Sequence, residues 1–386
     1  MGFETQIREA LKELESAGLR RFPPRISGAQ GPEVELDGRR VLCFCSNNYL
    51  GFADHPSIAK ALQGPAAEEG VGAAASRLIT GTMDAHEELE AALADFCRGP
   101  DAVLFSSGYA ANVGTIQALV GRSDVVFSDA LNHASLIDGA RLSRATVHVY
   151  RHGDPDHLES LLRTHRGSAA RALIVTDSLF SMDGDRAPLA ELAVLARHYD
   201  AGLLVDEAHA LGVFGPEGRG LSADLGVAPD VIIGTLGKSF GVAGAFASGS
   251  ADVMSFLRNR ARSYVYSTAP PPPIVRAALA SIPLVRNADE RRRTLLAHAS
   301  QLRRGLRALG FHVAEHESQI IPVRIGENDR TMQLSAELLD QGVFVQGIRP
   351  PTVPEGSARL RLTAMATHRP EQIEYALQAF SSVQRR

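Results

Sequence analysis

The chain has 386 residues, of which 45% are hydrophobic and 22% are charged, as is typical of a globular protein with a large core. Its 40 basic and 44 acidic side chains give a net charge of −4, which argues against a nucleic-acid-binding protein or any other general polyanion binder. No apolar run of 18 residues occurs, so we expect no membrane span.

The N-terminal 21 residues have the pattern of a charged amphipathic helix, and no apolar segment follows their basic residues as it would in a secretory signal. We therefore expect a cytoplasmic protein. Residues 34–44 predict a β-hairpin, because two apolar runs flank Asp37 and Gly38.

Three cysteines occur, Cys43, Cys45 and Cys97, and no pair has the C-x-x-C spacing. The odd number argues against a disulfide framework, and the spacing argues against a zinc site. We expect small buried thiols, with Cys43 and Cys45 on one face of a strand, and no metal.

A long alternation of apolar runs and helical patterns follows the hairpin. The helical patterns include residues 86–98, 110–120, 155–165 and 188–199, and the strand-like runs are residues 102–106, 124–129, 146–150, 171–177, 202–207, 230–235 and 243–248. Near-continuous apolar strands that alternate with helices predict an α/β fold with a mostly parallel seven-stranded sheet between helices. Such sheets bind their ligands at the carboxyl ends of the strands.

The pattern changes after the proline run 270–273, which marks a loop or a helix start. A helical region continues to about residue 309, and short strands at 320–325, 343–347 and 358–363 precede a final helix from 370. This predicts a smaller α+β domain. The expected division is an N-terminal helix and hairpin segment (1–45), a large domain (46–285) and a small C-terminal domain (286–386).

Polar side chains mark the ends of four predicted strands. Asp206 ends one strand and His209 follows it, while His133, Ser181 and Lys238 lie beyond three others. An unpaired buried carboxylate is costly, and a desolvated lysine is a nucleophile toward carbonyl groups, so both side chains suggest a use.

The stretch Ser107-Gly108-Tyr109 begins a helix, and the free amides of a first helical turn bind anions. A cofactor with an aldehyde, a phosphate and a ring nitrogen would use all these groups: Lys238 for the aldehyde, the helix start for the phosphate and Asp206 for the ring nitrogen. Pyridoxal 5′-phosphate is that cofactor.

Each group also has an ordinary interpretation. Lys238 is compatible with a solvated lysine at a strand end, His133 with a loop histidine and Asp206 with a helix N-cap. The stretch at Ser107 is compatible with a plain helix start. All four interpretations would have to hold at once, which favours the cofactor.

Eight stretches in this order resemble the α-oxoamine synthase family of pyridoxal-phosphate enzymes, which have the fold type I architecture. They are SNNYLGF (46–52), SSGYAAN (106–112), NHAS (132–135), FSMDGDRAPL (180–189), VDEAHALGVFGPEGRG (205–220), GTLGKSFG (234–241), YSTAPPP (266–272) and GIRPPTVPEGSARLRLT (347–363). The resemblance covers essentially the whole chain and implies a pyridoxal-phosphate-dependent acyltransferase.

The resemblance also implies roles for single residues. Lys238 would bind the cofactor and move the proton at the substrate α-carbon, Asp206 would pair with the ring nitrogen, and His209 would bond the phenolic oxygen. His133 would stack on the ring with Ser181 nearby. The residues implied at the phosphate are Ser107, Gly108, Tyr109 and Thr235, with Ser267 and Thr268 from a second subunit, which makes the protein a homodimer with sites at the interface.

On the substrate side, Arg361 would clamp the amino-acid carboxylate with Asn47 close by, while Thr352 and Arg21 would help to place an acyl thioester. From the residues alone, Arg359 shares a face with Arg361, so the choice of Arg361 comes from the resemblance. The C-terminal stretch is most similar to members that join L-alanine to a pimeloyl thioester, carried by coenzyme A or by a carrier protein.

Alternatives remain within and outside the family: 2-amino-3-ketobutyrate CoA ligase, 5-aminolevulinate synthase, serine palmitoyltransferase, an aminotransferase on the same fold, or a catalytically silent binding protein. The sequence also departs from the usual family pattern at Glu207, Leu236 and Ser239, and residues 70–82 are less rich in glycine.

Overall fold

The computed structural model describes residues 2–63 and 68–384. The chain divides into two compact units. The small unit comprises Met1–Ser46, Met182–Gly184 and Thr294–Arg386, and the large unit comprises Asn47–Ser181 and Asp185–Arg293. The expected division of the chain into an N-terminal segment (1–45), a large domain (46–285) and a small domain (286–386) remains a prediction.

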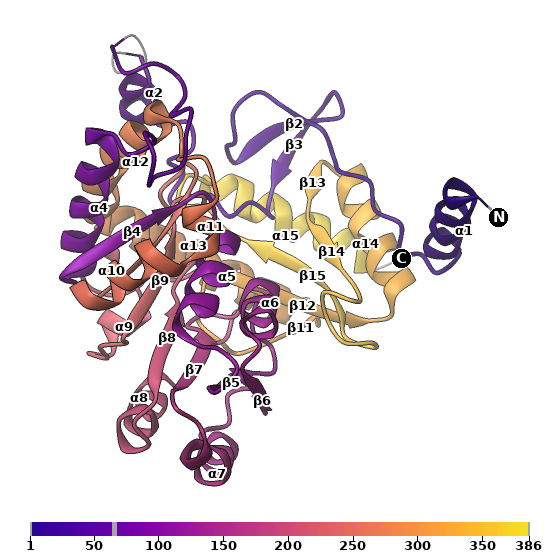
Figure 1. Cartoon of the computed structure of the whole chain (residues 1–386). Coiled ribbons are helices and arrows are strands. Elements are labelled where there is room, and N and C mark those ends of the chain that lie inside the picture. Colours follow the sequence, from indigo (N-terminus) through magenta and orange to yellow (C-terminus); the bar gives the residue numbers. More distant parts are fainter. Residues whose placement is uncertain (1, 64–67, 385–386) are drawn as a thin grey trace. The chain divides into compact units, whose positions relative to one another are not determined.

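A seven-stranded sheet forms the centre of the large unit (Figure 1). Its spatial order is β4 (Asp101–Phe105), β10 (Ala245–Gly249), β9 (Val231–Thr235), β8 (Gly202–Asp206), β7 (Ala172–Asp177), β5 (Val125–Asp129) and β6 (Thr146–Tyr150). Strand β10 runs in the direction opposite to that of the other six strands. The predicted mostly parallel sheet is confirmed, and every residue of β5 and β7 is buried, as strands covered on both faces require.

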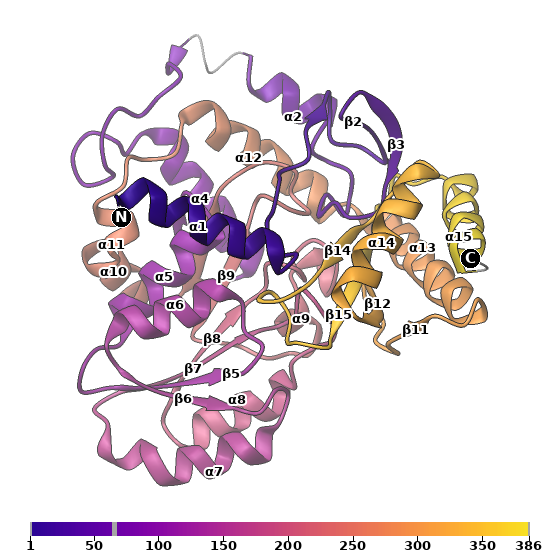
Figure 2. The ribbon, with the colours of Figure 1, turned by 90° about the vertical axis from the view of Figure 1, so that its right-hand side faces the viewer.

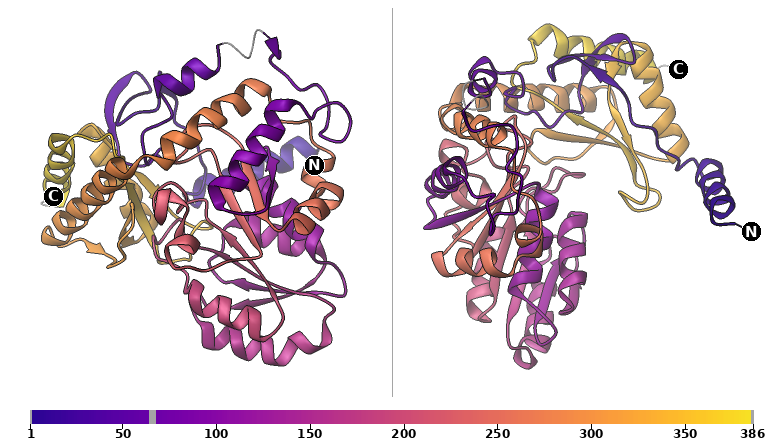
Figure 3. Two further views of the ribbon diagram at one scale, coloured as in Figure 1. Left: turned by 90° about the vertical axis from the view of Figure 1, so that its left-hand side faces the viewer. Right: turned by 45° about the horizontal axis from the view of Figure 1, so that its top comes forward.

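Helices flank this sheet. They are α2 (Pro56–Ala61), α4 (Asp84–Cys97), α5 (Gly108–Leu119), α6 (Ala134–Ser143), α7 (Pro155–His165), α8 (Leu189–His198), α9 (Leu221–Asp224), α10 (Ala251–Arg260), α11 (Arg262–Val265) and α12 (Pro272–Arg286), with short 3₁₀ turns η1 (Arg166–Ser168) and η2 (Pro216–Gly218). Helices α5 and α6 pack side by side (Figure 2), and α12 packs along α4 (Figure 3, left, orange and purple). Helix α13 (Asp289–Ala308) continues from the large unit into the small one.

The small unit contains two four-stranded sheets. One has the order β1 (Ile26–Ser27), β2 (Glu33–Leu36), β3 (Arg39–Cys43) and β13 (Val343–Phe344); the other has the order β11 (His312–Val313), β12 (Ile320–Gly326), β15 (Ala358–Thr363) and β14 (Gln346–Ile348). Its helices are α1 (Phe3–Ser16), α14 (Asn328–Asp340) and α15 (Pro370–Gln384). The β2–β3 hairpin is confirmed, and its turn residues Asp37 and Gly38 both have positive φ.

Two predicted elements differ from the structure. Residues 343–347 are two short strands rather than one, because β13 pairs with β3 whereas β14 pairs with β15 in the other sheet. The N-terminal helix ends at Ser16, close to Gly18, which adopts a φ of 64°. A left-handed glycine commonly ends a helix.

A buried ion pair fixes the segment that precedes α4. The Arg77 guanidinium donates to both carboxylate oxygens of Glu90, at 2.9 and 3.0 Å, and both side chains are less than 10% exposed. Glu90 also accepts from the Leu104 amide at 2.8 Å, and the Arg77 guanidinium lies 5.3 Å from the Tyr264 ring centroid. The pair therefore ties residues 70–82 to α4, β4 and α11.

We predict that Arg77→Met lowers the free energy of unfolding by about 3–5 kcal/mol, because it leaves the Glu90 carboxylate buried without its bidentate partner. Urea unfolding measures this loss. Arg77→Met combined with Glu90→Leu should recover most of the stability, and Arg163→Met on the exposed face of α7 should change it by less than about 0.5 kcal/mol. Equal stability of Arg77→Met and the unchanged chain would contradict the prediction.

Candidate active site

The parallel strands of the large unit place their carboxyl-terminal residues at one edge of the sheet. Asp129 ends β5, Asp177 ends β7, Asp206 ends β8 and Thr235 ends β9. Asp177 and Asp206 are partners in the register of β7 and β8, so their backbones are adjacent. This edge is where the sequence predicts the ligand site.

Asp206 is 5% exposed, and its carboxylate accepts two hydrogen bonds. The Asn112 amide donates to its Oδ2 at 2.6 Å, and the Ala208 backbone amide donates to its Oδ1 at 2.9 Å. Hydrogen bonds to a charged group typically contribute about 1.5–3 kcal/mol. The carboxylate is therefore positioned by α5 and by its own turn, and it does not cap a helix.

His133 lies between β5 and α6 and is fixed by both its backbone and its ring. Its amide donates to Asp177 Oδ2 at 2.8 Å, and its Nδ1 lies 2.7 Å from Ser135 Oγ, which in turn accepts from the Asn112 amide at 2.9 Å. Burial lowers the pKa of His133; the Asp206 carboxylate opposes this effect and Lys238 adds to it. A neutral imidazole next to Asp206 results.

Asp177 shares this edge. Burial raises the pKa of its carboxyl well above the usual range, and the Asp206 charge raises it further, although the bond from the His133 amide opposes both effects.

Lys238 lies in a closed loop after β9. The Leu236 amide donates to the Gly244 carbonyl, and the Val242 amide donates back to the Leu236 carbonyl, each at 2.9 Å. Gly241 closes the turn with a φ of 72°, and a β-carbon there would lie 2.5 Å from the Phe52 carbonyl carbon. The loop presents the Lys238 amine 2.9 Å from His209 Nε2.

The N-terminus of α5 lies at the same edge, after β4. Ser107 caps it: Ser107 Oγ accepts from the Ala110 amide at 3.1 Å, and its carbonyl accepts from the Ala111 amide at 2.9 Å. The amides of Gly108 and Tyr109 precede these and belong to the first turn, which has no intrahelical acceptor. A β-carbon on Gly108 would meet no atom within 4 Å, so space for an anion remains beside this backbone.

The remaining predicted cofactor residues lie at the end of β9 and in loops of the large unit. Thr235 Oγ1 donates to the Gly244 carbonyl at 3.3 Å and accepts from the Gly237 amide at 3.2 Å. Ser181 is half-buried and has a partner of its own. Thr268 forms a bridge with Ser76, next to the hydrogen bond from the Ala269 amide to the Ala75 carbonyl.

The predicted substrate residues Arg361, Arg21 and Thr352 belong to the small unit, whereas Asn47 begins the large one. Arg361 is 6% exposed on β15. Its neighbour Arg359 is paired with the Asp183 carboxylate and donates to the Ser357 carbonyl. Arg359 thus has partners within the small unit, and Arg361 remains the residue that the family resemblance assigns to the substrate carboxylate.

Arg21 and Thr352 meet within the small unit, where the Arg21 guanidinium donates to Thr352 Oγ1 at 3.2 Å. Both line a cavity of about 660 Å³ together with Arg349 and apolar side chains such as Phe22 and Ile348. The structure thus brings together the two residues that the sequence assigned to the acyl thioester.

Four residues at the site were not assigned roles from the sequence: Asn112, Ser135, Asp177 and Tyr49. Asn112, Ser135 and Tyr49 lie inside stretches that were recognised, and only the contacts of Asn112 with Asp206 and of Ser135 with His133 reveal the first two. Tyr49 Oη lies 2.7 Å from His209 Nδ1.

The three single residues that depart from the family pattern, Glu207, Leu236 and Ser239, are buried. Glu207 accepts from Ser178 Oγ at 2.7 Å and from the amides of Leu221 and Ser222 at the start of α9, at 3.0 and 2.7 Å. Burial raises its pKa. Glu207 therefore holds α9, while Leu236 and Ser239 are almost completely buried.

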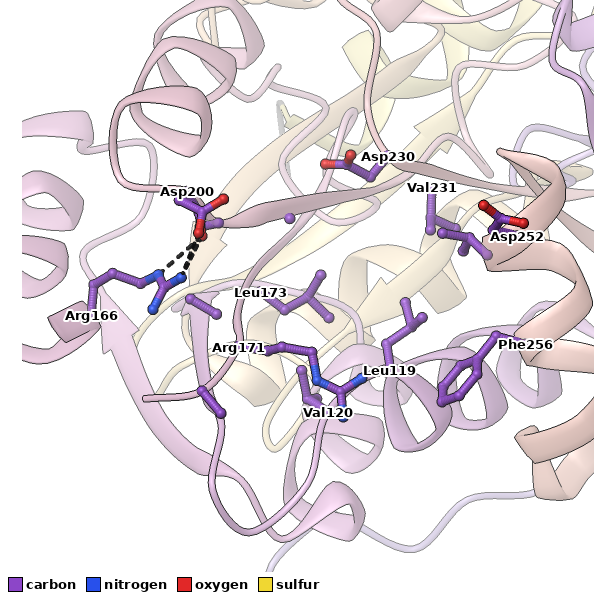
Figure 4. Close-up of a pocket in the computed structure, with 15 residues that line it drawn as sticks. Leu119, Val120, Arg166, Arg171, Leu173, Asp200, Asp230, Val231, Asp252 and Phe256 are labelled. Carbon is purple, nitrogen blue, oxygen red and sulfur yellow. Dashed lines mark hydrogen bonds and ion pairs between the residues drawn. The ribbon is translucent and has the colours of Figure 1, made fainter. Parts of the chain in front are cut away.

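A second cavity, of about 550 Å³, opens at the amino ends of β7, β8 and β9 (Figure 4). Three of its charged side chains have partners: Arg166 binds Asp200, and Asp230 accepts from the Leu203 amide at 2.8 Å. The cavity lies at the opposite ends of these strands from Asp177, Asp206 and Lys238, so it is separate from the candidate site. Among the described residues, no helix is long and apolar enough to cross a lipid bilayer.

Known proteins resemble this chain over nearly its full length. A family model described as aminotransferase class I and II matches residues 39–380. The 8-amino-7-oxononanoate synthase of Citrifermentans bemidjiense is 52% identical over 372 residues, 95% of each chain. A solved structure of SPT with PLP has a TM-score of 0.94 and 32% identity, and it covers 100% of this chain and 99% of that one. The 8-amino-7-oxononanoate synthase structure from Francisella tularensis has a TM-score of 0.77 and 28% identity, and it covers 89% and 97%.

His152 ties two loops at this edge of the sheet. Its Nδ1 lies 2.9 Å from Asp129 Oδ1 and its Nε2 lies 2.6 Å from Asp185 Oδ2. Burial alone would lower its pKa, but the two carboxylates outweigh burial and raise the pKa to about 10, from an ordinary value of 6.5.

Because the pKa of His152 is raised on folding, the stability it contributes should be complete below pH 6.5 and should be lost as the pH rises through about 10. Urea unfolding of the unchanged chain and of His152→Gln across this range measures the contribution. We expect the difference between the two proteins to shrink with rising pH. A constant difference would contradict the ionic role of His152.

Proposed function

The chain belongs to the aminotransferase class I and II family, and we propose that it joins L-alanine to a pimeloyl thioester, as 8-amino-7-oxononanoate synthases do. The reaction forms a bond between the alanine α-carbon and the acyl carbon. The thiol of coenzyme A or of a carrier protein leaves, and so does carbon dioxide. The observation that supports this proposal is that Asp206, His209 and Lys238 come together at one sheet edge, in a chain 52% identical to such a synthase.

The residues of the large unit fit pyridoxal 5′-phosphate. Lys238 supplies an amine, Asp206 a buried carboxylate and Ser107 a capped helix start with open space beside Gly108. When bound, the cofactor supplies an aldehyde that captures an amine and a protonated ring that withdraws electrons from the adjacent carbon.

Asp206 would hold the proton on the ring nitrogen. Its burial strengthens that interaction, and its bonds from Asn112 and Ala208 keep it oriented. His133 would lie against the ring face, with its position set by Asp177 and Ser135. The amides of Gly108 and Tyr109, with Thr235, would hold the phosphate at the α5 N-terminus.

Lys238 would take the α-proton of alanine on Nζ and later return a proton to the same carbon. Arg361 would bind the alanine carboxylate through its planar fork. Arg21 and Thr352 would contact the thioester in the cavity of the small unit. A homodimer in which Ser267 and Thr268 reach the partner's phosphate site completes the proposal.

The reaction is tested by measuring thiol release from pimeloyl-CoA with alanine, glycine and serine. Alanine should be the preferred partner, and a higher rate with glycine or serine and another acyl-CoA would assign a sister activity. No thiol release with any thioester, but amino exchange with a keto acid, would favour an aminotransferase.

Lys238→Ala should lower kcat by at least about 10²–10⁴-fold, because it removes both the covalent amine and the proton acceptor. The chain has three lysines, Lys12, Lys60 and Lys238, so Lys60→Ala on the exposed face of α2 is a direct control that should keep full activity. Borohydride reduction followed by peptide mapping should place the cofactor on Lys238. Cofactor found on Lys12 or Lys60 would contradict the assignment.

A further inference from the structure

A line of polar contacts leads from Asn47 to the Lys238 amine through Tyr49 and His209. Tyr49 Oη lies 3.1 Å from Asn47 Oδ1 and 2.7 Å from His209 Nδ1, and His209 Nε2 lies 2.9 Å from Lys238 Nζ. Tyr49 is completely buried and His209 is 6% exposed. At these separations each contact is a hydrogen bond, so each needs one donor.

Counting protons fixes the direction of each bond. The Asn47 oxygen only accepts, so the single hydroxyl proton of Tyr49 is donated to it. The Tyr49 oxygen must then accept from His209, which places a proton on Nδ1. A neutral imidazole carries one N–H, and the Nε2 lone pair of His209 is therefore directed at the Lys238 amine.

We propose that Tyr49 and Asn47 hold His209 in the Nδ1–H tautomer, so that His209 Nε2 takes a proton from the Lys238 ammonium and leaves the amine neutral. In this step an Nζ–H bond breaks, its electron pair stays on Nζ, and an N–H bond forms at Nε2. The positive charge moves to the imidazolium, whose Nδ1–H remains bonded to Tyr49.

The surrounding charges explain why such an acceptor is needed. Asp177 and Asp206 end the neighbouring strands, and Lys238 is close enough to Asp177 for its charge to lower the pKa of the Asp177 carboxyl. His133, another imidazole at this edge, is engaged with Ser135 at Nδ1. Only a neutral amine attacks a carbonyl carbon, so a base in contact with Nζ increases the reactive fraction.

Tyr49 is thus a positioning residue, which acts on Lys238 through His209. The inference rests on the proposed function only in that Lys238 is the amine that captures the cofactor. This role belongs to the hydroxyl of Tyr49 and not to its ring. The variant Tyr49→Phe therefore removes the acceptor for the His209 Nδ1–H but keeps nearly the same buried volume.

Nitrogen NMR of the full-length chain labelled with ¹⁵N-histidine tests the tautomer directly, before and after addition of pyridoxal phosphate. The chain has 13 histidines, and the His209 signals are identified by their loss in His209→Gln. Without cofactor, we expect the Nδ1–H pattern in the unchanged chain. Tyr49→Phe should populate the Nε2–H form, and so should Asn47→Ala, which frees the Tyr49 proton for donation to Nδ1.

The rate of cofactor capture as a function of pH tests the consequence. Tyr49→Phe should raise the pH midpoint of capture by about one unit, the size expected for one lost hydrogen bond to the charged imidazole. Tyr150→Phe removes the hydroxyl of another fully buried tyrosine, on β6. The capture rate of this control variant should depend on pH in the same way as that of the unchanged chain.

An Nε2–H pattern for His209 in the unchanged chain without cofactor would overturn the proposal. So would an unaltered tautomer and capture profile in both Tyr49→Phe and Asn47→Ala. If Tyr49→Phe does not fold, Asn47→Ala decides both measurements. Failure of the unchanged chain to capture pyridoxal phosphate at any pH would instead count against the proposed function.

Discussion

Burial of the Asp206 carboxylate at the end of β8 is the constraint around which the candidate site is built. A charge in that position needs donors, and Asn112 supplies one from α5 while the chain itself supplies another at Ala208. Asn112 also donates to Ser135, whose hydroxyl contacts the His133 ring. The Asn112 side chain therefore binds the carboxylate directly and positions the imidazole through Ser135. The electrostatics of the whole edge depend on this arrangement, since the pKa values of His133 and Asp177 both respond to the Asp206 charge.

The sequence predicts the layout of this edge well because parallel strands impose it. Asp206, Lys238 and His133 are far apart along the chain, but strands that run in one direction deliver their ends to one edge. The strand alternation, the hairpin and the helix start at Ser107 all follow from local patterns. The split of residues 343–347 between two sheets does not, because it depends on which strand lies alongside, β3 or β15.

The partners of the predicted residues are what local patterns miss. Asn112 and Asp206 are 94 residues apart, and Tyr49 and His209 are 160 apart, so nothing in either neighbourhood indicates the contact. Glu207 is instructive in the same way. In the sequence it is a departure beside Asp206, and in the structure its carboxylate receives a hydroxyl and two amides and anchors α9. A substitution next to a functional residue can thus serve packing alone.

The small unit takes three separate stretches of the chain, including the three residues Met182–Gly184 that interrupt the large unit. Ser318 Oγ donates to the Gly184 carbonyl at 2.8 Å, so this short insertion is bonded to its own unit. Neither unit is therefore encoded by one continuous piece of the gene. Removal of either terminus therefore takes away part of the small unit, and cleavage of the chain at a single site cannot separate the two units.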